Sequence, residues 1–248
     1  MTAKLAKGVK AGAAVTKDST VALPFEVAEQ IRALTEFLRQ PYLVGELEMP
    51  LGNVQWGVYA FFDYDEEPIY VGQTRESLSS RIGRHLTGRR SDAVAKNILD
   101  PFEVCTVRVY PMPSLQGRSA KTDVEAKETI DALEHNVFQE LLTKSRFQAV
   151  LNEKPPPAPK RAVGIPAYLE RRIATDKITE LRDHPDIRIA RRAQTLAALA
   201  TGISERRVSS GIRNTLLTQA KRLQWLAERR AQVAPDGPDE VEDEDPKD

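Results

Sequence analysis

Two short runs rich in aromatic and β-branched residues decide the fold of this chain. The first run is Gly57-Val58-Tyr59-Ala60-Phe61-Phe62, and the second is Ile69-Tyr70-Val71-Gly72. Between them lies the acidic segment Asp63-Tyr64-Asp65-Glu66-Glu67-Pro68. Aromatic and β-branched residues favour strands, and a polar segment that ends in proline favours a turn. The three segments together predict a β-hairpin.

Amphipathic segments lie on both sides of this hairpin. Residues 25–38 carry apolar side chains at helical spacing, and residues 78–86 and 124–144 show the same period. Residues 102–110 alternate strongly enough to predict a third strand. We therefore expect an α/β (α+β) fold over residues 23–154, with a three-stranded antiparallel sheet flanked by helices.

The run Pro155-Pro156-Pro157-Ala158-Pro159 ends regular structure, because proline lacks a backbone donor and biases its predecessor toward extended geometry. It predicts a linker at residues 155–160, either a semi-rigid connector or an arm on the domain surface. Residues 161–234 are expected to form an all-α region, whereas residues 1–22 and 235–248 are expected to be disordered. The helices predicted in the all-α region span residues 168–181, 187–200, 205–212 and 215–231.

Cysteine and histidine are scarce. The single cysteine, Cys105, excludes a disulfide framework and is expected to be a small buried hydrophobe. The three histidines His85, His135 and His184 are too widely separated to suggest an all-protein zinc site. No stretch approaches the roughly 18 apolar residues of a membrane span, and the first twenty residues lack the apolar region of a signal peptide. These features predict a soluble, cytoplasmic protein with no membrane partner.

The formal net charge of zero is a sum over three unlike parts. Residues 1–159 carry −2, residues 160–234 carry +9 and residues 235–248 carry −7. A basic block of this kind is typical of a polyanion binder, and equally of a charge-rich, solvated helical surface. The acidic tail is expected to be a solubilising segment or, alternatively, a phosphate mimic that competes for the basic part.

Two tyrosines, an arginine and a histidine follow one another at regular spacing. Tyr70 lies eleven positions after Tyr59, Arg81 eleven positions after Tyr70, and His85 four positions after Arg81. Positions i and i+4 share one face of a helix, so Arg81 and His85 are expected to point the same way.

Two later residues complete the pattern, Glu134 inside the helix predicted at residues 124–144 and Asn152 just after it. With the triplets at residues 57–59 and 70–72, this order resembles the GIY-YIG nuclease superfamily over roughly residues 57–154. The resemblance implies an enzyme, a DNA endonuclease that hydrolyses phosphodiester bonds with one divalent cation, Mg²⁺ or Mn²⁺. The site residues that it implies are Tyr59, Tyr70, Arg81, His85, Glu134 and Asn152, with Gly57 and Gly72 as structural members of the motif.

Each implied residue has a chemical task. Arg81 is permanently charged and can stabilise the phosphorane, while Glu134 is the expected ligand of a hard cation. By the resemblance Tyr59 is the leading choice for the general base or its relay, with Tyr70 positioning water and phosphate. His85 can pass the proton onward, and the division of roles among the three rings stays open.

Other residues compete for some of these tasks. Glu134 has rivals on the same predicted helix in Glu125, Glu128 and Glu140, and is preferred because it follows Leu133 at the edge of the apolar stripe. Asn152 is expected to act structurally, through hydrogen bonds to the backbone of the site or to a tyrosine. The alternative function is a catalytically idle module that binds nucleic acid or protein. Such a module would be expected to lack a tyrosine, the arginine or the carboxylate, and none is missing.

The basic C-terminal part contains a partial helix-turn-helix pattern around Gly202. Ala198 precedes this glycine by four positions and Val208 follows it by six, but Gly211 stands where an apolar residue is expected. The pattern predicts DNA contacts, and the equal alternative is a helical bundle that packs on the nuclease-like part or mediates self-association. The possible DNA-binding residues are Arg206, Arg207, Ser209 and Arg213.

Overall fold

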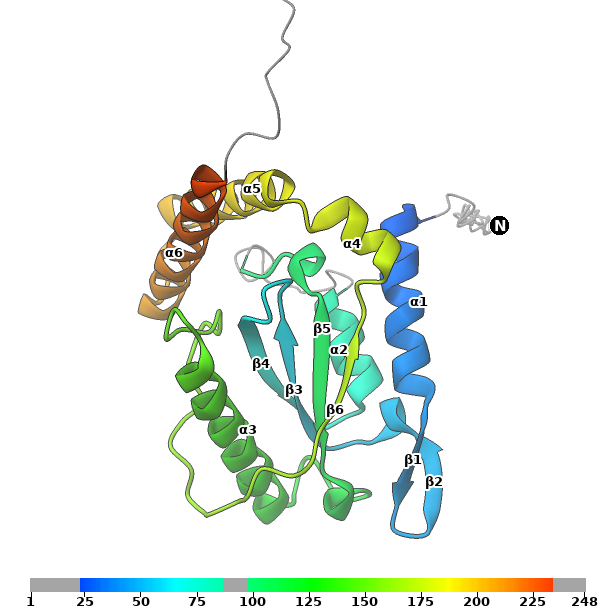
Figure 1. The fold of residues 1–248 in the computed structure, drawn as a ribbon. Helices are drawn as coiled ribbons and strands as arrows, with labels where there is room; N and C mark the ends of the chain where they lie inside the picture. The colour runs from blue at the N-terminus through cyan, green and yellow to red at the C-terminus, as the bar shows by residue number, and fades with distance from the viewer. Residues whose placement is uncertain (1–22, 87–97, 234–248) are drawn as a thin grey trace, which may run out of the picture.

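The computed structural model describes residues 23–86 and 98–233, which form an α+β fold around a four-stranded antiparallel sheet (Figure 1). The sheet has the strand order β4-β3-β5-β6, and β1 and β2 form a separate hairpin. The strands are β1 (Pro41–Val44), β2 (Leu47–Pro50), β3 (Gly57–Phe62), β4 (Pro68–Thr74), β5 (Thr106–Pro111) and β6 (Leu169–Arg172). The helices are α1 (Phe25–Arg39), α2 (Leu78–Leu86), α3 (Val124–Lys144), α4 (Asp176–Arg182), α5 (Pro185–Ser204) and α6 (Ser210–Gln232).

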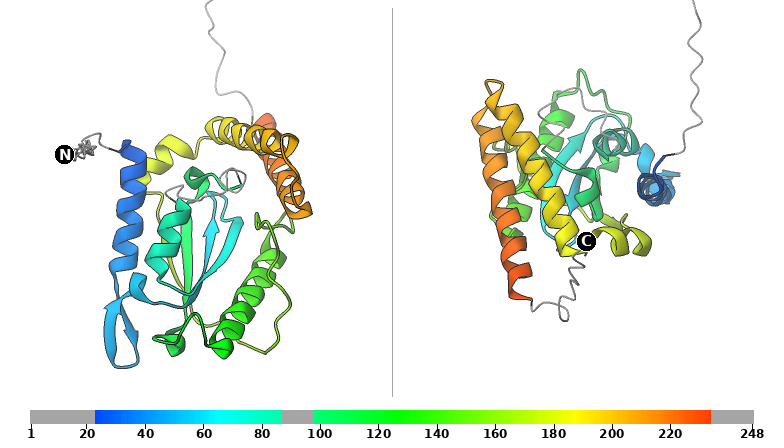
Figure 2. Two further views of the ribbon diagram at one scale, coloured as in Figure 1. Left: turned by 180° about the vertical axis from the view of Figure 1, so that it is seen from behind. Right: turned by 90° about the horizontal axis from the view of Figure 1, so that it is seen from above.

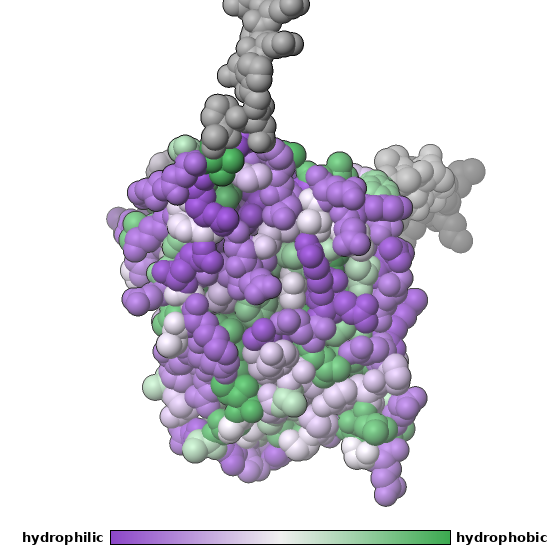
Figure 3. Space-filling model, in the orientation of Figure 1, coloured by the Kyte–Doolittle hydropathy of each residue, from purple (hydrophilic) through white to green (hydrophobic). Residues whose placement is uncertain are grey.

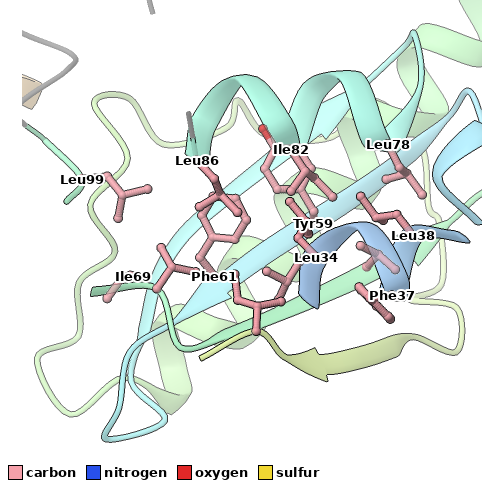
Figure 4. Close-up of a cluster of buried hydrophobic side chains, with 14 of the residues drawn as sticks. Leu34, Phe37, Leu38, Tyr59, Phe61, Ile69, Leu78, Ile82, Leu86 and Leu99 are labelled. Atoms are coloured by element: carbon pink, nitrogen blue, oxygen red, sulfur yellow. The ribbon is translucent and has the colours of Figure 1, made fainter. Parts of the chain in front are cut away.

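The alternation of side chains along β3 divides the core into two layers. Tyr59 and Phe61 point to one face, where α1 and α2 pack on them (Figure 4). Val58, Ala60 and Phe62 point to the other face and pack against α3. Because β3 is buried on both faces over its whole length, it is a central strand of the sheet.

The predicted hairpin is confirmed, with Tyr59 opposite Gly72 and Phe61 opposite Tyr70. The predicted helices at residues 78–86 and 124–144 coincide with α2 and α3. A side-chain cap fixes the start of α3, where Asp123 Oδ1 accepts a hydrogen bond from the backbone N–H of Ala126 at 2.9 Å.

Two local predictions need correction, and one element was not predicted. The helix predicted from residue 168 is wrong at its start, because Leu169–Arg172 pair with β5 as the fourth strand of the sheet and α4 begins only at Asp176. The strand predicted at residues 102–110 begins at Thr106, since Pro101–Glu103 form a 3₁₀ turn. The β1–β2 hairpin was not predicted from the sequence.

The proline-rich segment is an arm that lies along α3. The ring Nδ1 of His135 lies 3.1 Å from the carbonyl oxygen of Pro156, and Asn136 Nδ2 donates to the carbonyl oxygen of Val163 at 2.6 Å. These contacts hold the chain against α3 while it returns to the sheet at β6 (Figure 1).

The last two helices form an antiparallel hairpin packed on the sheet domain (Figure 2). Arg230 near the end of α6 pairs with Asp186 at the start of α5, and Arg192 donates to the backbone carbonyl of Arg222. The two helices predicted at residues 205–212 and 215–231 are in fact one helix, α6, preceded by a turn at residues 205–209. This antiparallel pair differs from the steeply crossed helices of a helix-turn-helix unit.

A buried cluster of charges joins the hairpin to the sheet domain. Arg192 and Arg222 both reach Asp63 Oδ2, at 2.9 and 2.8 Å, and both also pair with Glu103. The side chains of Arg192, Arg222 and Asp63 are each only 2% exposed. Much of the positive charge after residue 160 is therefore compensated inside the molecule by acids of the preceding part.

The face of the molecule that carries α5 and α6 is covered mainly by hydrophilic residues, with apolar residues scattered between them (Figure 3). None of the helices in the described part of the chain combines the length and the apolar composition that a membrane crossing requires. Cys105 is buried beside Ala174 and Ile178, and burial raises the pKa of its thiol. Residues 1–22 and 235–248, predicted to be disordered, lie outside the described residues.

Candidate active site

Three aromatic rings from three different elements meet on the α2 face of the sheet. The ring centroid of Tyr59 on β3 lies 6.2 Å from that of Tyr70 on β4 and 5.6 Å from that of His85 on α2. The centroids of Tyr70 and His85 are 4.8 Å apart. The structure thus brings together three residues that the sequence spacing singled out.

Gly72 makes room for this cluster. A Cβ atom at this position would lie 2.6 Å from the hydroxyl oxygen of Tyr59 and 2.9 Å from Cε1 of Tyr70, closer than nonbonded atoms allow. Gly57 is also crowded, since a Cβ there would lie 3.0 Å from the carbonyl oxygen of Tyr110. Both motif glycines are therefore places of close approach, and at Gly72 the approaching groups are the two tyrosines themselves.

Arg81 lies one helical turn before His85 on α2 and is half-buried. Its Nε is buried and has no hydrogen-bond partner among the residues that the structure describes. The Arg81 guanidinium is close enough to Glu134 for its charge to oppose a rise in the pKa of that carboxyl. Arg81 therefore connects the aromatic cluster to the carboxylate on α3.

Glu134 faces β4 from α3. Gln73 Nε2 donates to Glu134 Oε2 at 3.0 Å and to Asp131 Oδ1 at 2.5 Å, and Arg75 pairs with Asp131 at 2.6 Å. Burial is the main cause that raises the pKa of the Glu134 carboxyl, and the nearby charge of Asp131 adds to it. The hydrogen bond from Gln73 and the charges of Arg81 and Arg75 act in the opposite direction.

The three rivals of Glu134 are all engaged in ion pairs elsewhere on α3. Glu125 pairs with Arg118 and Arg161, Glu128 with Lys160, and Glu140 with Lys144. Of these four glutamates, only Glu134 accepts a hydrogen bond from a β4 side chain in the described part of the chain.

Sequence reasoning missed Gln73, Arg75 and Asp131. The period of a strand and the period of a helix could have predicted these three residues. Gln73 and Arg75 alternate with Gly72 and Thr74, so they leave the strand on the α3 side, while Asp131 precedes Glu134 by three positions and shares its helix face.

Asn152 binds both backbone polar groups of Val71, the residue between Tyr70 and Gly72. Its Oδ1 accepts from the N–H of Val71 at 3.0 Å, and its Nδ2 donates to the carbonyl oxygen of Val71 at 2.7 Å. The N–H of the preceding Leu151 donates to the carbonyl oxygen of Ile69 at 2.9 Å. Residues 151–152 therefore continue the ladder on the open edge of β4, which holds the second tyrosine triplet in place.

The carboxylates at this edge suit a hard divalent cation. Within residues 23–86 and 98–233 no group of three or more histidine, cysteine, aspartate or glutamate side chains is placed to hold a metal ion. Glu134 and Asp131, however, both accept from the same amide nitrogen of Gln73. Mg²⁺ commonly uses one or two carboxylates and completes its shell with water and substrate phosphate, so this donor set fits it.

The residues predicted to contact DNA lie at the turn between α5 and α6. Arg206 and Arg207 are exposed in the turn, and Arg213 is exposed on the first turns of α6. Ser209 caps α6, since its Oγ accepts from the N–H of Ile212 at 3.4 Å. Its hydroxyl also donates to Glu153 Oε1 at 3.2 Å.

Comparison with known proteins assigns a family to part of the chain. Residues 55–143 match the family model of the GIY-YIG catalytic domain. This range contains the aromatic cluster, Arg81 and Glu134, and ends before Asn152. No curated protein and no solved structure gives a significant match to the chain.

Proposed function

We propose that this chain, through its GIY-YIG catalytic domain, is a metal-dependent endonuclease that hydrolyses phosphodiester bonds of DNA. The observation that carries the proposal is the convergence on β4 of Tyr59, Tyr70 and His85 with Arg81 and Glu134. Every residue that the sequence motif requires is present, and the rings stand next to one another.

In the proposed reaction, a water oxygen forms a bond to phosphorus and the bond from phosphorus to the 3′-oxygen breaks. Tyr59 accepts the proton of the attacking water, and His85, whose ring centroid is 5.6 Å away, can take it onward. Tyr70 orients water and phosphate from the neighbouring strand. The 3′-oxygen leaves with the bonding electrons and takes a proton from solvent, so the products are a 5′-phosphate and a 3′-hydroxyl.

Arg81 supports the transition state. The negative charge on the phosphoryl oxygens grows as the water attacks, and a permanently charged, forked donor neutralises it. Glu134 with Asp131 would hold the divalent cation, Mg²⁺ or Mn²⁺, which when bound supplies positive charge at the phosphate and at the leaving oxygen.

Supercoiled plasmid tests this proposal directly. The protein is incubated with plasmid and MgCl₂ or MnCl₂, and nicked and linear products are followed over time. We expect cleavage by the wild type, none by Glu134→Gln, and wild-type cleavage by Glu140→Gln, a matched change on the same helix at a carboxylate that pairs with Lys144. Equal behaviour of wild type and Glu134→Gln would reject the proposal, and DNA binding without nicking would identify a catalytically idle module instead.

A further inference from the structure

The arginines from α4 to the end of α6 divide into two groups. Most of the arginines on α4, α5 and the C-terminal half of α6 point inward or sideways to acids. Arg188 pairs with Asp65 and Asp183, and Arg191 pairs with Asp100 at 2.8 Å. The other arginines paired in this way are Arg182, Arg192, Arg222, Arg229 and Arg230. Arg188, Arg192 and Arg222 join the hairpin to acids of the sheet domain, and their side chains are buried.

The second group lies at the opposite end of the hairpin. Arg206, Arg207 and Arg213 are exposed and make no ion pair or side-chain hydrogen bond with any residue in the described ranges. They follow one another around the α5–α6 turn, where Glu205 and Glu153 offset part of their charge, so the corner keeps a net positive charge. A corner of this kind attracts a phosphate backbone.

This corner is fixed next to the edge of the candidate active site. Ser209 bonds to Glu153, and Gly211 lies so close to the carbonyl oxygen of Glu153 that a Cβ atom there would overlap it. Glu153 directly follows Asn152, which holds Val71. Seen from behind, β4 lies between α2 and the turn end of the hairpin (Figure 2).

The first turns of α6 are occupied by packing. Ile212 and Thr215 are buried, and Gly211 is pressed against Glu153, which explains why a glycine stands where a helix-turn-helix unit has an apolar residue. The outer face of α6 stays exposed at Arg213, Asn214 and Leu217. The exposed arginines of the turn and of this face suit contact with phosphates.

We infer that the turn at residues 205–209, together with Arg213, is a phosphate-binding arm that holds the DNA backbone beside the cleaved bond. This inference rests on the proposed function, because it takes DNA as the substrate. The contact is with the backbone, so the arm contributes affinity and orientation without sequence preference.

A pair of variants with equal changes in charge tests the arm. DNA binding is measured in a Glu134→Gln background, with a duplex of arbitrary sequence, at several KCl concentrations. Arg206→Ala/Arg207→Ala is expected to lower the slope of log K against log [KCl] by about 2, since each neutralised phosphate contributes about 0.9. Arg171→Ala/Lys177→Ala removes two exposed bases at the other edge of the sheet, on β6 and α4, and is expected to leave the slope unchanged.

The outcomes separate the arm from the nuclease. An unchanged slope in Arg206→Ala/Arg207→Ala, or an equal loss in the control pair, overturns the arm even if the wild type nicks plasmid. A loss that appears with one duplex sequence and not with unrelated ones also overturns it, because backbone contacts do not read sequence. A wild type that binds with the expected slopes but never nicks rejects the nuclease and leaves the arm. Deleting the whole hairpin is not a clean test, because it also removes the partners of Asp63 and Glu103.

Discussion

The phenol ring of Tyr59 lies across the α-carbon of Gly72, its partner on the neighbouring strand, so closely that a Cβ there would be 2.6 Å from the hydroxyl oxygen and 2.8 Å from Cζ. The two triplets of the motif are therefore one steric unit. The glycine of the second triplet has no side chain, and the tyrosine of the first triplet occupies the space that a side chain would fill.

Gly72→Ala is expected to displace Tyr59 and to lower the cleavage rate about 100-fold, because a shift of about 1 Å in a reacting group costs that much. Overpacking of this kind lowers the free energy of unfolding by about 1–3 kcal/mol. The matched control is Gly83→Ala on α2, where a Cβ meets no atom within 4 Å, and we expect it to fold and cleave as the wild type does. Plasmid nicking and urea unfolding measure both effects, and full activity in Gly72→Ala would refute the steric argument.

Asn152→Ala is expected to leave the N–H and carbonyl of Val71 without their side-chain partner. An unsatisfied backbone group costs about 1–3 kcal/mol, and the β4 edge that carries Tyr70 loses its support. Asn152→Asp keeps the acceptor for the N–H and loses the donor, so its cleavage rate should lie between those of wild type and Asn152→Ala. The opposite order of the two variants would contradict a positioning role.

Glu134→Gln is expected to abolish cleavage without lowering the melting temperature at neutral pH. Burial raises the pKa of the Glu134 carboxyl above 4.5 in the folded protein, so its ionisation costs more in the folded than in the unfolded state. The stability that Glu134 contributes is present below pH 4.5 and is lost as the pH rises through the raised pKa. Melting curves of wild type and variant should therefore separate above that pKa, with the variant the more stable. A variant that melts at a lower temperature than the wild type at pH 7 to 8 would show that ionised Glu134 stabilises the folded protein, contrary to this prediction.

The same raised pKa predicts how cleavage depends on pH. A cation binds the ionised carboxylate, so the rate should fall on acidification with a midpoint above 4.5, the ordinary value for glutamate. The measurement is the nicking rate at saturating and subsaturating MgCl₂. More Mg²⁺ should shift the midpoint to lower pH. A midpoint that does not change with the Mg²⁺ concentration would contradict the prediction that Glu134 is a ligand of the cation.

Arg192→Met is expected to lower the free energy of unfolding by about 3–5 kcal/mol, because Asp63 and Glu103 stay buried with less compensation. The control is Arg230→Met, which breaks a pair whose acid, Asp186, is 53% exposed, and should leave the stability nearly unchanged. Urea unfolding of both variants makes the comparison. Equal losses in the free energy of unfolding would mean that the buried ion pairs contribute no more to stability than the exposed pair does.

The sequence predicted those parts of the fold that local pattern specifies. The helices α2 and α3 were placed to the residue, because the period of their apolar side chains is clear over their whole length. The strand β6 was missed because Leu169-Glu170-Arg171-Arg172 are good helix formers, and pairing with β5, some sixty residues earlier, overrides that preference. Helix propensity depends on the local sequence and contains no information about a strand partner so distant in the chain.

The candidate site shows the same division. Tyr59, Tyr70, Arg81 and His85 were implied by the resemblance, and the structure brings the three rings together, with Arg81 one helical turn before His85. Gln73 and Asp131 became visible only when β4 was packed on α3. The charge of the C-terminal part was counted correctly from the sequence, but which arginines face acids and which face solvent is a property of the packed hairpin.

The buried cluster also sets an order of events during synthesis. Asp63 and Glu103 leave the ribosome long before Arg192 and Arg222, yet both acids depend on those arginines for their burial. A chain interrupted before α5 contains every residue of the candidate active site and none of the charges that let its domain close.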